Sequence, residues 1–271
     1  MNFPCPIRGQ IAARNELSLE CFGTGNASFV VTGYGRKRGF GAQVMASGGQ
    51  LIVVVGLAFE ARIAAGPGIR VICSGDGRDL ALSLSRACIE GCRSVISFGV
   101  AGGLDPGLRP GTCVVGSAIL SGMTRLATDH EWSQRLLQTI PGAVHGMIAG
   151  VPAPIAHPEA KRALYTKTGA MAVDMESHIV AGVAAAHGLP VAAIRVITDP
   201  AVRALPEAAV AAMRPNGTTD IIAMIRSVIK RPQELPALLR TALDARAARA
   251  TLLRGRQLLG PSLGLPEFLE A

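Results

Sequence analysis

The sequence predicts an α/β fold with a mostly parallel sheet and helices on both of its faces. Two observations lead to this prediction: β-branched runs alternate with amphipathic helical patterns, and the composition suits a large buried core. Of the 271 residues, 49% are apolar and 17% are charged. Such a chain is too apolar and too weakly charged to be disordered. Repeated strand–helix–strand units of this length are typical of parallel sheets.

The first half of the pattern begins at residue 51. A continuous β-branched run predicts a strand that is buried on both faces at residues 51–55, and a second such strand is expected at 69–73. Further strands are expected at 94–98, 112–120 and 144–151. An amphipathic helix is expected over residues 79–90, and Gly91 ends it. The third strand runs into Gly99-Val-Ala-Gly-Gly103, which we interpret as a glycine-rich turn.

The second half of the pattern begins with a short strand over residues 170–173. A helix over 176–187 follows, ended by Gly188 and Pro190, and then a buried strand over 191–197. The rest of the chain reads as helical. We divide the chain into a mobile N-terminal extension or mis-assigned start (1–47), an α/β domain (48–230) and a basic helical C-terminal extension (231–271).

The net charge of +8 is gathered at the two ends of the chain. Residues 226–256 carry eight Lys or Arg and two acidic residues, and residues 1–47 carry five and two. The middle is therefore close to neutral, whereas a nucleic-acid enzyme more often spreads positive charge over its working face. We expect no nucleic-acid partner. A cytoplasmic location is expected, because we find neither a signal-peptide pattern nor an apolar run long enough to span a membrane.

In α/β sheets, ligands bind outside the carboxyl ends of the strands. Four segments combine such an end with glycines or a carboxylate: 56–60, 99–103, 173–176 and 198–199. Taken singly, Glu60, Asp174, Glu176 and Asp199 also suit structural roles in surface ion pairs, helix caps or turns. Together they suit cleavage of an N-glycosidic bond. One carboxylate activates water, one binds ribose hydroxyls and a third supports the departing base.

Three segments resemble the signature segments of the purine nucleoside phosphorylase/nucleosidase superfamily: Gly99-Val-Ala-Gly-Gly-Leu104, Val173-Asp-Met-Glu176 and Arg195-Val-Ile-Thr-Asp199. The resemblance is close to methylthioadenosine/S-adenosylhomocysteine nucleosidases. It is closest to the nucleosidase-like phosphorylase of hopanoid biosynthesis, which releases adenine from adenosylhopane and leaves ribosylhopane. The resemblance implies a three-layer α/β/α sandwich around a mixed, partly barrel-like sheet, with no cofactor.

The resemblance also implies a role for each site residue. Glu60 and Asp199 match catalytic residues: Glu60 activates the attacking water, and Asp199 faces N7 and the 6-amino group of adenine. Glu176 matches the ligand of the ribose hydroxyls, with Met175 packing against the sugar. The remaining residues expected to line the substrate site are Ala101, Gly102 and Thr198.

Chemistry favours adenine as the base and water as the nucleophile. An aspartate that accepts from a 6-amino group would be left unpaired or repelled by a 6-oxo purine. Phosphorolysis would need a phosphate cradle, usually with arginines, and none lies near Gly99 in the sequence. Glu60 would also repel phosphate. Arg62, Arg195 or an arginine from another subunit could reverse this expectation.

Two departures from the family pattern concern the substrate. The family usually supplies a phenylalanine that stacks on adenine, where this chain reads Val151-Pro-Ala-Pro-Ile155. The region over residues 121–142 is short, and in small-substrate nucleosidases a longer one encloses the 5′ substituent. We therefore expect an open 5′ side, which suits a bulky or lipid group better than methylthio.

We expect an N-ribosyl hydrolase that acts on a small-molecule or lipid-linked 5′-modified adenosine. The alternatives are a phosphorylase, a nucleosidase for methylthioadenosine or S-adenosylhomocysteine, and a non-catalytic nucleoside-binding or membrane-surface adaptor. The interleaved leucines and arginines of residues 235–259 suit either a helix packed on the core or a basic amphipathic helix on anionic lipid at the inner membrane face. The resemblance implies a homo-oligomer. The histidines show no metal-ligand spacing, and no metal is expected.

Overall fold

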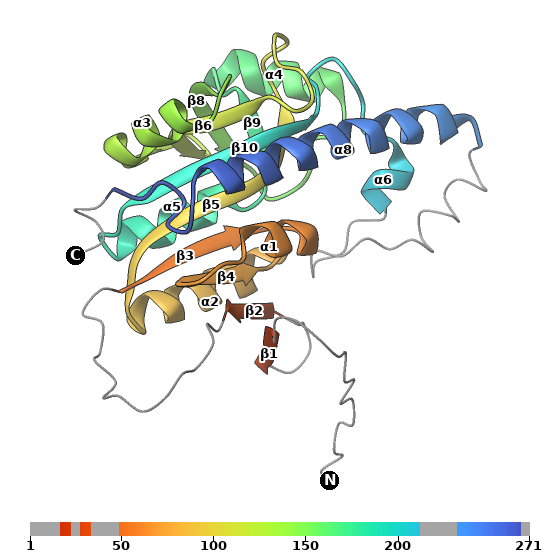
Figure 1. Ribbon diagram of the computed structural model, residues 1–271. Helices are drawn as coiled ribbons and strands as arrows, with labels where there is room; N and C mark the ends of the chain where they lie inside the picture. The colour runs from red at the N-terminus through yellow and green to blue at the C-terminus, as the bar shows by residue number, and fades with distance from the viewer. Residues whose placement is uncertain (1–16, 23–27, 34–48, 212–231, 267–271) are drawn as a thin grey trace, which may run out of the picture.

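The computed structural model describes residues 17–22, 28–33, 49–211 and 232–266 of the chain. A ten-stranded mixed sheet forms the centre (Figure 1). Its strands are β1 (Leu17–Phe22), β2 (Ser28–Gly33), β3 (Gln50–Val55), β4 (Ile69–Cys73), β5 (Cys92–Gly103), β6 (Cys113–Ser121), β7 (Thr124–Ala127), β8 (Val144–Gly150), β9 (Ala172–Asp174) and β10 (Val191–Asp199). The helices are α1 (Ala58–Ala64), α2 (Gly77–Ile89), α3 (His130–Thr139), α4 (Pro158–Thr168), α5 (Ser177–Ala186), α6 (Glu207–Ala211), the 3₁₀ turn η1 (Pro232–Glu234) and α8 (Leu235–Leu258).

Part of the sheet closes on itself. The strand order is β1-β2-β4-β3-β5-β10-β6-β8-β9, and β9 pairs in turn with β5. The ring β5-β10-β6-β8-β9 is therefore a small barrel, and β3, β4, β2 and β1 extend the sheet from its β5 side. Strands β3, β4, β5 and β10 run parallel, whereas β10–β6 and β5–β9 are antiparallel. The expected mixed, partly barrel-like sheet is confirmed.

Helices cover the sheet on both faces, which confirms the three-layer arrangement (Figure 1). Successive residues of a strand point to opposite faces, and β3 shows this alternation clearly. Val53 and Val55 belong to one apolar cluster, with residues of α1, α3 and α8. Ile52 and Val54 belong to a second cluster, with residues of α2 and α5. Both faces of β3 are buried, as its continuous β-branched run predicts.

The strand at 69–73 has the predicted bounds, and the other predicted strands and helices of the α/β domain are present with shifted ends. The glycine-rich turn predicted at 99–103 is wrong, because this segment is the last part of β5. It pairs with β10 on one side, and Gly102 and Gly103 pair with β9 on the other. Two strands, β1 and β2, lie within the N-terminal segment that the sequence left unstructured. The rest of 1–47 lies outside the described residues.

The long C-terminal helix α8 has two different halves. In the second half Ala248, Leu252 and Gly255 are buried, and just beyond the helix the backbone oxygen of Leu263 accepts a 2.9 Å hydrogen bond from Trp132 Nε1. In the first half every large apolar side chain is at least partly exposed, and this end projects from the body (Figure 1). Among the described helices, none is long and apolar enough to cross a membrane.

Candidate active site

A cavity of about 430 Å³ lies at the carboxyl ends of β3, β5 and β10. Its size is in the range of small-molecule sites. All seven residues that the sequence nominated line it: Glu60, Ala101, Gly102, Met175, Glu176, Thr198 and Asp199. The structure therefore brings together side chains that lie up to 139 positions apart in the chain.

Glu60 lies in the first turn of α1, directly after β3, and is 2% exposed. Its Oε2 accepts hydrogen bonds from the backbone N–H groups of Gly56 (3.0 Å) and Leu57 (2.9 Å). Its Oε1 accepts from Val100 N–H on β5 at 2.7 Å. Burial raises the pKa of Glu60 above its ordinary value, while Arg195 and the three N–H groups act in the opposite direction. The carboxylate is fixed in direction and is a stronger base than an exposed one.

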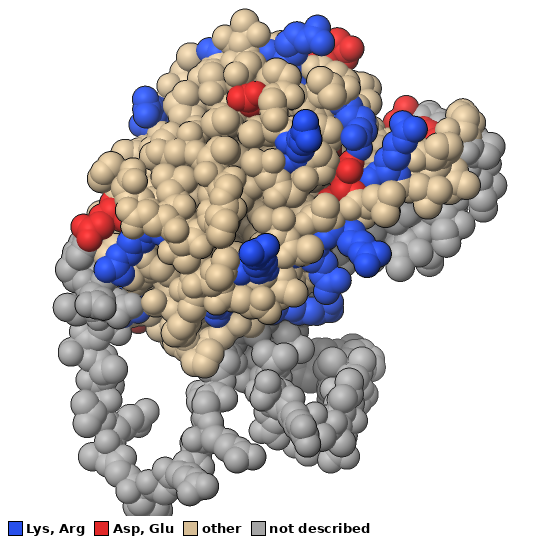
Figure 2. Space-filling model, turned by 45° about the horizontal axis from the view of Figure 1, so that its top comes forward, with Lys and Arg blue, Asp and Glu red and all other residues tan. Residues whose placement is uncertain are grey.

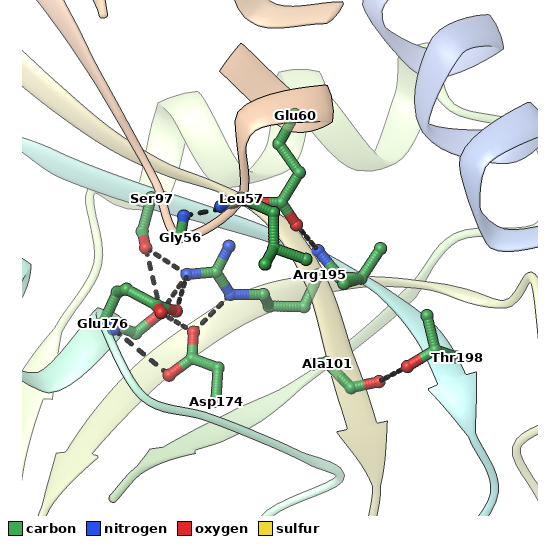
Figure 3. Close-up of polar contacts among 11 residues, drawn as sticks. Gly56, Leu57, Glu60, Ser97, Ala101, Asp174, Glu176, Arg195 and Thr198 are labelled. Atoms are coloured by element: carbon green, nitrogen blue, oxygen red, sulfur yellow. Dashed lines mark hydrogen bonds and ion pairs between the residues drawn. The ribbon is translucent and has the colours of Figure 1, made fainter. Parts of the chain in front are cut away.

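Arg195, on β10, is a buried cation beside Asp174 and Glu176 (Figure 3). Its Nε donates to Asp174 Oδ2, and one terminal nitrogen lies 3.7 Å from Glu176 Oε2. The same nitrogen donates to the hydroxyl groups of Ser97 (2.6 Å) and Ser177 (3.2 Å). Because these contacts hold its guanidinium on acids and hydroxyls of the protein, Arg195 orients Glu176 and is poorly placed to cradle a phosphate.

Glu176 lies between β9 and α5 with its side chain 15% exposed. Burial and the charge of Asp174 raise its pKa to about 8, and Glu60 adds to the rise while Arg195 opposes it. Asp174 itself accepts from Ser177 N–H at 3.1 Å, which is the capping contact expected from the sequence.

Glu60 and Glu176 lie so close to the backbone that two positions beside them have room only for glycine. A Cβ added at Gly99 would lie 2.5 Å from Glu60 Oε1 and 2.8 Å from a terminal nitrogen of Arg195. A Cβ added at Gly56 would lie 2.4 Å from Glu176 Oε1. The glycines therefore leave room for protein carboxylates.

Asp199 is the last residue of β10 and lines the cavity. Its Oδ1 contacts the Thr198 hydroxyl at 2.8 Å, and its Oδ2 accepts from Lys161 Nζ at 2.6 Å. Thr198 Oγ1 also lies 3.2 Å from the backbone oxygen of Ala101 (Figure 3). The carboxylate is thus held from two sides while it still faces the cavity.

The lining is acidic and aliphatic. No Lys or Arg is among the described lining residues, and Arg62 is exposed on α1. No aromatic side chain is among them either, and the apolar part of the wall consists mainly of Leu57, Val100, Val151, Pro154, Ile155, Val173, Leu205 and Val210. A flat purine would pack between aliphatic side chains here. Within the described part of the chain, no group of three or more His, Cys, Asp or Glu is arranged to hold a metal ion.

The sequence did not predict that two basic residues belong to the site. Arg195 was considered only as a ligand for phosphate. Lys161 gave no signal, because a lysine in a polar helix pattern predicts an exposed side chain. The carboxylates were found because each follows a strand end.

Residues 53–230 match the family described as "Phosphorylase superfamily". The chain belongs to this superfamily. Among solved structures, this superfamily member is similar to a 5′-methylthioadenosine/S-adenosylhomocysteine nucleosidase of Helicobacter pylori with 5′-methylthioadenosine in its active site (TM-score 0.53, 15% identity, 78% of this chain and 98% of that one). It is also similar to a Streptococcus pneumoniae nucleosidase of that kind with a transition-state inhibitor (TM-score 0.54, 15% identity, 78% and 99%).

A third similar structure is futalosine hydrolase of Helicobacter pylori (TM-score 0.53, 17% identity, 77% of this chain and 97% of that one). No curated protein matches the chain. These likenesses establish the nucleosidase-like fold of this superfamily member. Its substrate depends on the side chains that line its own cavity.

The raised pKa of Glu176 predicts how stability depends on pH. Its ordinary value is 4.5 and its value in the folded protein is about 8, so the folded state binds this proton more tightly than the unfolded chain. The resulting stabilisation is complete below pH 4.5 and is lost as the pH rises through about 8. We expect Tm to fall by several degrees between pH 5 and pH 9, and Glu60 contributes with the same sign.

Thermal unfolding of wild type and Glu176→Gln across this range tests the prediction. The glutamine cannot titrate, so the Tm of the variant should change less with pH than that of wild type. Equal slopes for the two proteins would contradict the assignment of the raised pKa to Glu176.

Proposed function

We propose that the protein hydrolyses the N-glycosidic bond of a 5′-modified adenosine and releases adenine. The observation that carries the proposal is the convergence of Glu60, Glu176 and Asp199 on one cavity that no described Lys or Arg lines. Water loses a proton to Glu60 while its oxygen bonds to C1′ of the ribose. The C1′–N9 bond breaks and its electron pair passes to the base. Asp199 relays a proton from solvent water to N7, so that adenine leaves as a neutral molecule.

Each remaining site residue has a place in this reaction. Glu176 binds the ribose hydroxyls, Met175 packs on the sugar, and the Ala101–Gly102 strand end lines the base. Water is favoured over phosphate because a dianion would enter a cavity that four acidic residues and no described Lys or Arg line. Two unit charges ~4 Å apart repel by roughly 4 kcal/mol at an effective dielectric of 20.

The finer proposal concerns the 5′ group, for which we favour a lipid, as in the conversion of adenosylhopane to ribosylhopane. Leu205 and Val210 extend the apolar wall towards α6. A purine nucleoside occupies a cavity of about 430 Å³, so a polycyclic lipid on its 5′ carbon would project through the mouth. The apolar side chains of Leu205 and Val210 favour such a substituent over a polar one.

The deciding experiment supplies adenosine, methylthioadenosine and an adenosyl-lipid, each with and without phosphate, and measures free adenine and the sugar product. We expect adenine release that does not depend on phosphate and is fastest with the adenosyl-lipid. Release only with phosphate would make the protein a phosphorylase, and preference for methylthioadenosine would refute the lipid assignment. Ligand binding without turnover of any substrate would leave a nucleoside-binding adaptor.

Delivery of a lipid substrate would be helped if the protein lay on an anionic membrane, and we propose the first half of α8 as the contact. Leu235, Leu239 and Leu243 are exposed on one side of this half. Arginines outnumber acids on the helix, and its Asp244 pairs with Arg203. Figure 2 shows the same excess of basic over acidic side chains on one face of the molecule. Exposed leucines beside arginines suit a lipid surface.

The contact can be tested without disturbing the packed half of α8. Deletion from residue 235 would also remove buried Leu252 and Leu263, so substitution is the sharper test. Leu239→Glu with Leu243→Glu should lower co-sedimentation with phosphatidylglycerol vesicles several-fold and leave hydrolysis of a soluble substrate unchanged. Leu82→Glu, on α2, is the matched control: its leucine is 63% exposed, against 60% and 64%. Equal vesicle binding by all variants would refute the contact.

A further inference from the structure

Lys161 is a fully buried charge that the reaction above does not use. It lies on α4 and is 0% exposed, whereas Lys167 in the last turn of the same helix is exposed. Its Nζ donates to Asp199 Oδ2 at 2.6 Å. It also lies 3.3 Å from the backbone oxygen of Asp199, 3.1 Å from that of Pro200 and 3.3 Å from that of Arg203. The ammonium is surrounded by oxygens from one short segment, 199–203.

Among the described contacts of the Lys161 ammonium, Asp199 supplies the carboxylate. A buried charge is costly unless it is paired and hydrogen-bonded, and the carboxylate that pairs with Lys161 lines the cavity. Buried ion pairs are often no more stabilising than apolar residues of the same volume. Stability is therefore a weak explanation for a lysine at this position, and its contact with a cavity-lining acid is the stronger one.

The geometry places the carboxylate between the ammonium and the cavity. Asp199 and Gly102 line the cavity, and Lys161 does not. A Cβ added at Gly102 would lie 3.0 Å from Asp199 Oδ2, so the oxygen that Lys161 holds lies against the cavity wall. Thr198 holds the other oxygen at 2.8 Å. Any rotation of the carboxylate would break one of these contacts.

We propose that Lys161 is a positioning residue for base release: its ammonium holds the carboxyl group of Asp199 aimed at the 6-amino and N7 edge of the purine. The inference rests on the proposed function and deepens it. As the C1′–N9 bond breaks, negative charge moves onto the base, and an uncompensated carboxylate beside it would oppose that charge. The positive charge of the Lys161 ammonium offsets the negative charge of the Asp199 carboxylate, so that hydrogen bonding between Asp199 and the base remains favourable.

Two leaving groups test the role. The variant is Lys161→Met, with Lys167→Met as the matched control on the same helix. We expect kcat/KM for adenine release to fall about 100-fold in Lys161→Met and to be unchanged in the control. With the same ribose carrying 4-nitrophenolate, which leaves as a stable anion without help at N7, the fall should be small. Lys161→Arg, which keeps the charge, should recover part of the adenine release.

A binding measurement tests the proposal without any turnover. Comparing adenine with ribose as ligands separates a local effect on Asp199 from a general loss of folding. Calorimetric titration with free adenine should show at least tenfold weaker binding by Lys161→Met than by Lys167→Met, and unchanged binding of ribose. Equal losses with both leaving groups and with ribose would show a merely structural lysine and overturn the proposal. So would unchanged adenine binding. If wild type binds adenine but cleaves no nucleoside, the proposed function fails, and this titration still decides the role of Lys161.

Discussion

Glu60→Gln should lower adenine release by about 10³-fold or more, because it removes the group that takes the proton from water. Glutamine has nearly the same shape, yet it presents one oxygen and one NH₂ group to the N–H groups of Gly56, Leu57 and Val100. At least one N–H then faces another donor. The variant therefore loses both its base and part of the hydrogen bonding that aims it. Single-turnover measurement of adenine release, at substrate concentrations above KM, gives the loss in the chemical step.

Two comparisons separate this loss from general damage. Glu159→Gln on α4 makes the same chemical change at an exposed position and should keep the wild-type rate. Calorimetry should show that Glu60→Gln still binds free adenine, since the proposed contact of the base is with Asp199. A Glu60→Gln enzyme with normal turnover would exclude Glu60 as the base and would reopen the adaptor alternative.

The fold was predictable where local sequence determines local structure. The β-branched run of β3 predicted a strand buried on both faces, because a short run rich in β-branched residues favours a buried strand over a helix. The closure of the barrel was not predictable from any run. It depends on two residue pairs between β5 and β9, which lie about 70 positions apart in the chain, and such long-range pairing has no local sequence signal.

The site residues also fall into those that the sequence could predict and those that it could not. Carboxylates at strand ends are visible in a sequence because strand ends are visible, so Glu60, Glu176 and Asp199 could be nominated together. Lys161 could not, because its burial follows from the approach of α4 to the segment after β10, which is a tertiary event. The segment that holds Gly99 and Gly102 was assigned to a turn although it is the end of β5, since a glycine kept for a close side chain and a glycine kept for a turn look the same in sequence.

That distinction makes Gly99 the site of the second large effect. Gly99→Ala keeps a backbone that alanine adopts readily in a strand, but it places a methyl group 2.5 Å from Glu60 Oε1 and 2.8 Å from Arg195. Because both groups are buried and hydrogen-bonded, one of them must move. A displacement of about 1 Å at a reacting group costs about 10²-fold in rate, and overpacking of this kind destabilises by ~1–3 kcal/mol. We expect both losses, measured by adenine release and by urea unfolding.

Gly182→Ala is the matched control, with an expected effect of opposite sign. Gly182 lies within α5, and a Cβ there meets nothing within 4 Å. Alanine should therefore stabilise the helix by about 0.5–1 kcal/mol and leave turnover unchanged. If Gly99→Ala behaved like Gly182→Ala, Glu60 and Arg195 could not lie against β5 as described, and the glycine-rich end of that strand would need another explanation. If only Gly99→Ala loses activity, the glycine at this position of β5 is needed because it leaves room for the Glu60 carboxylate, which takes the proton from water.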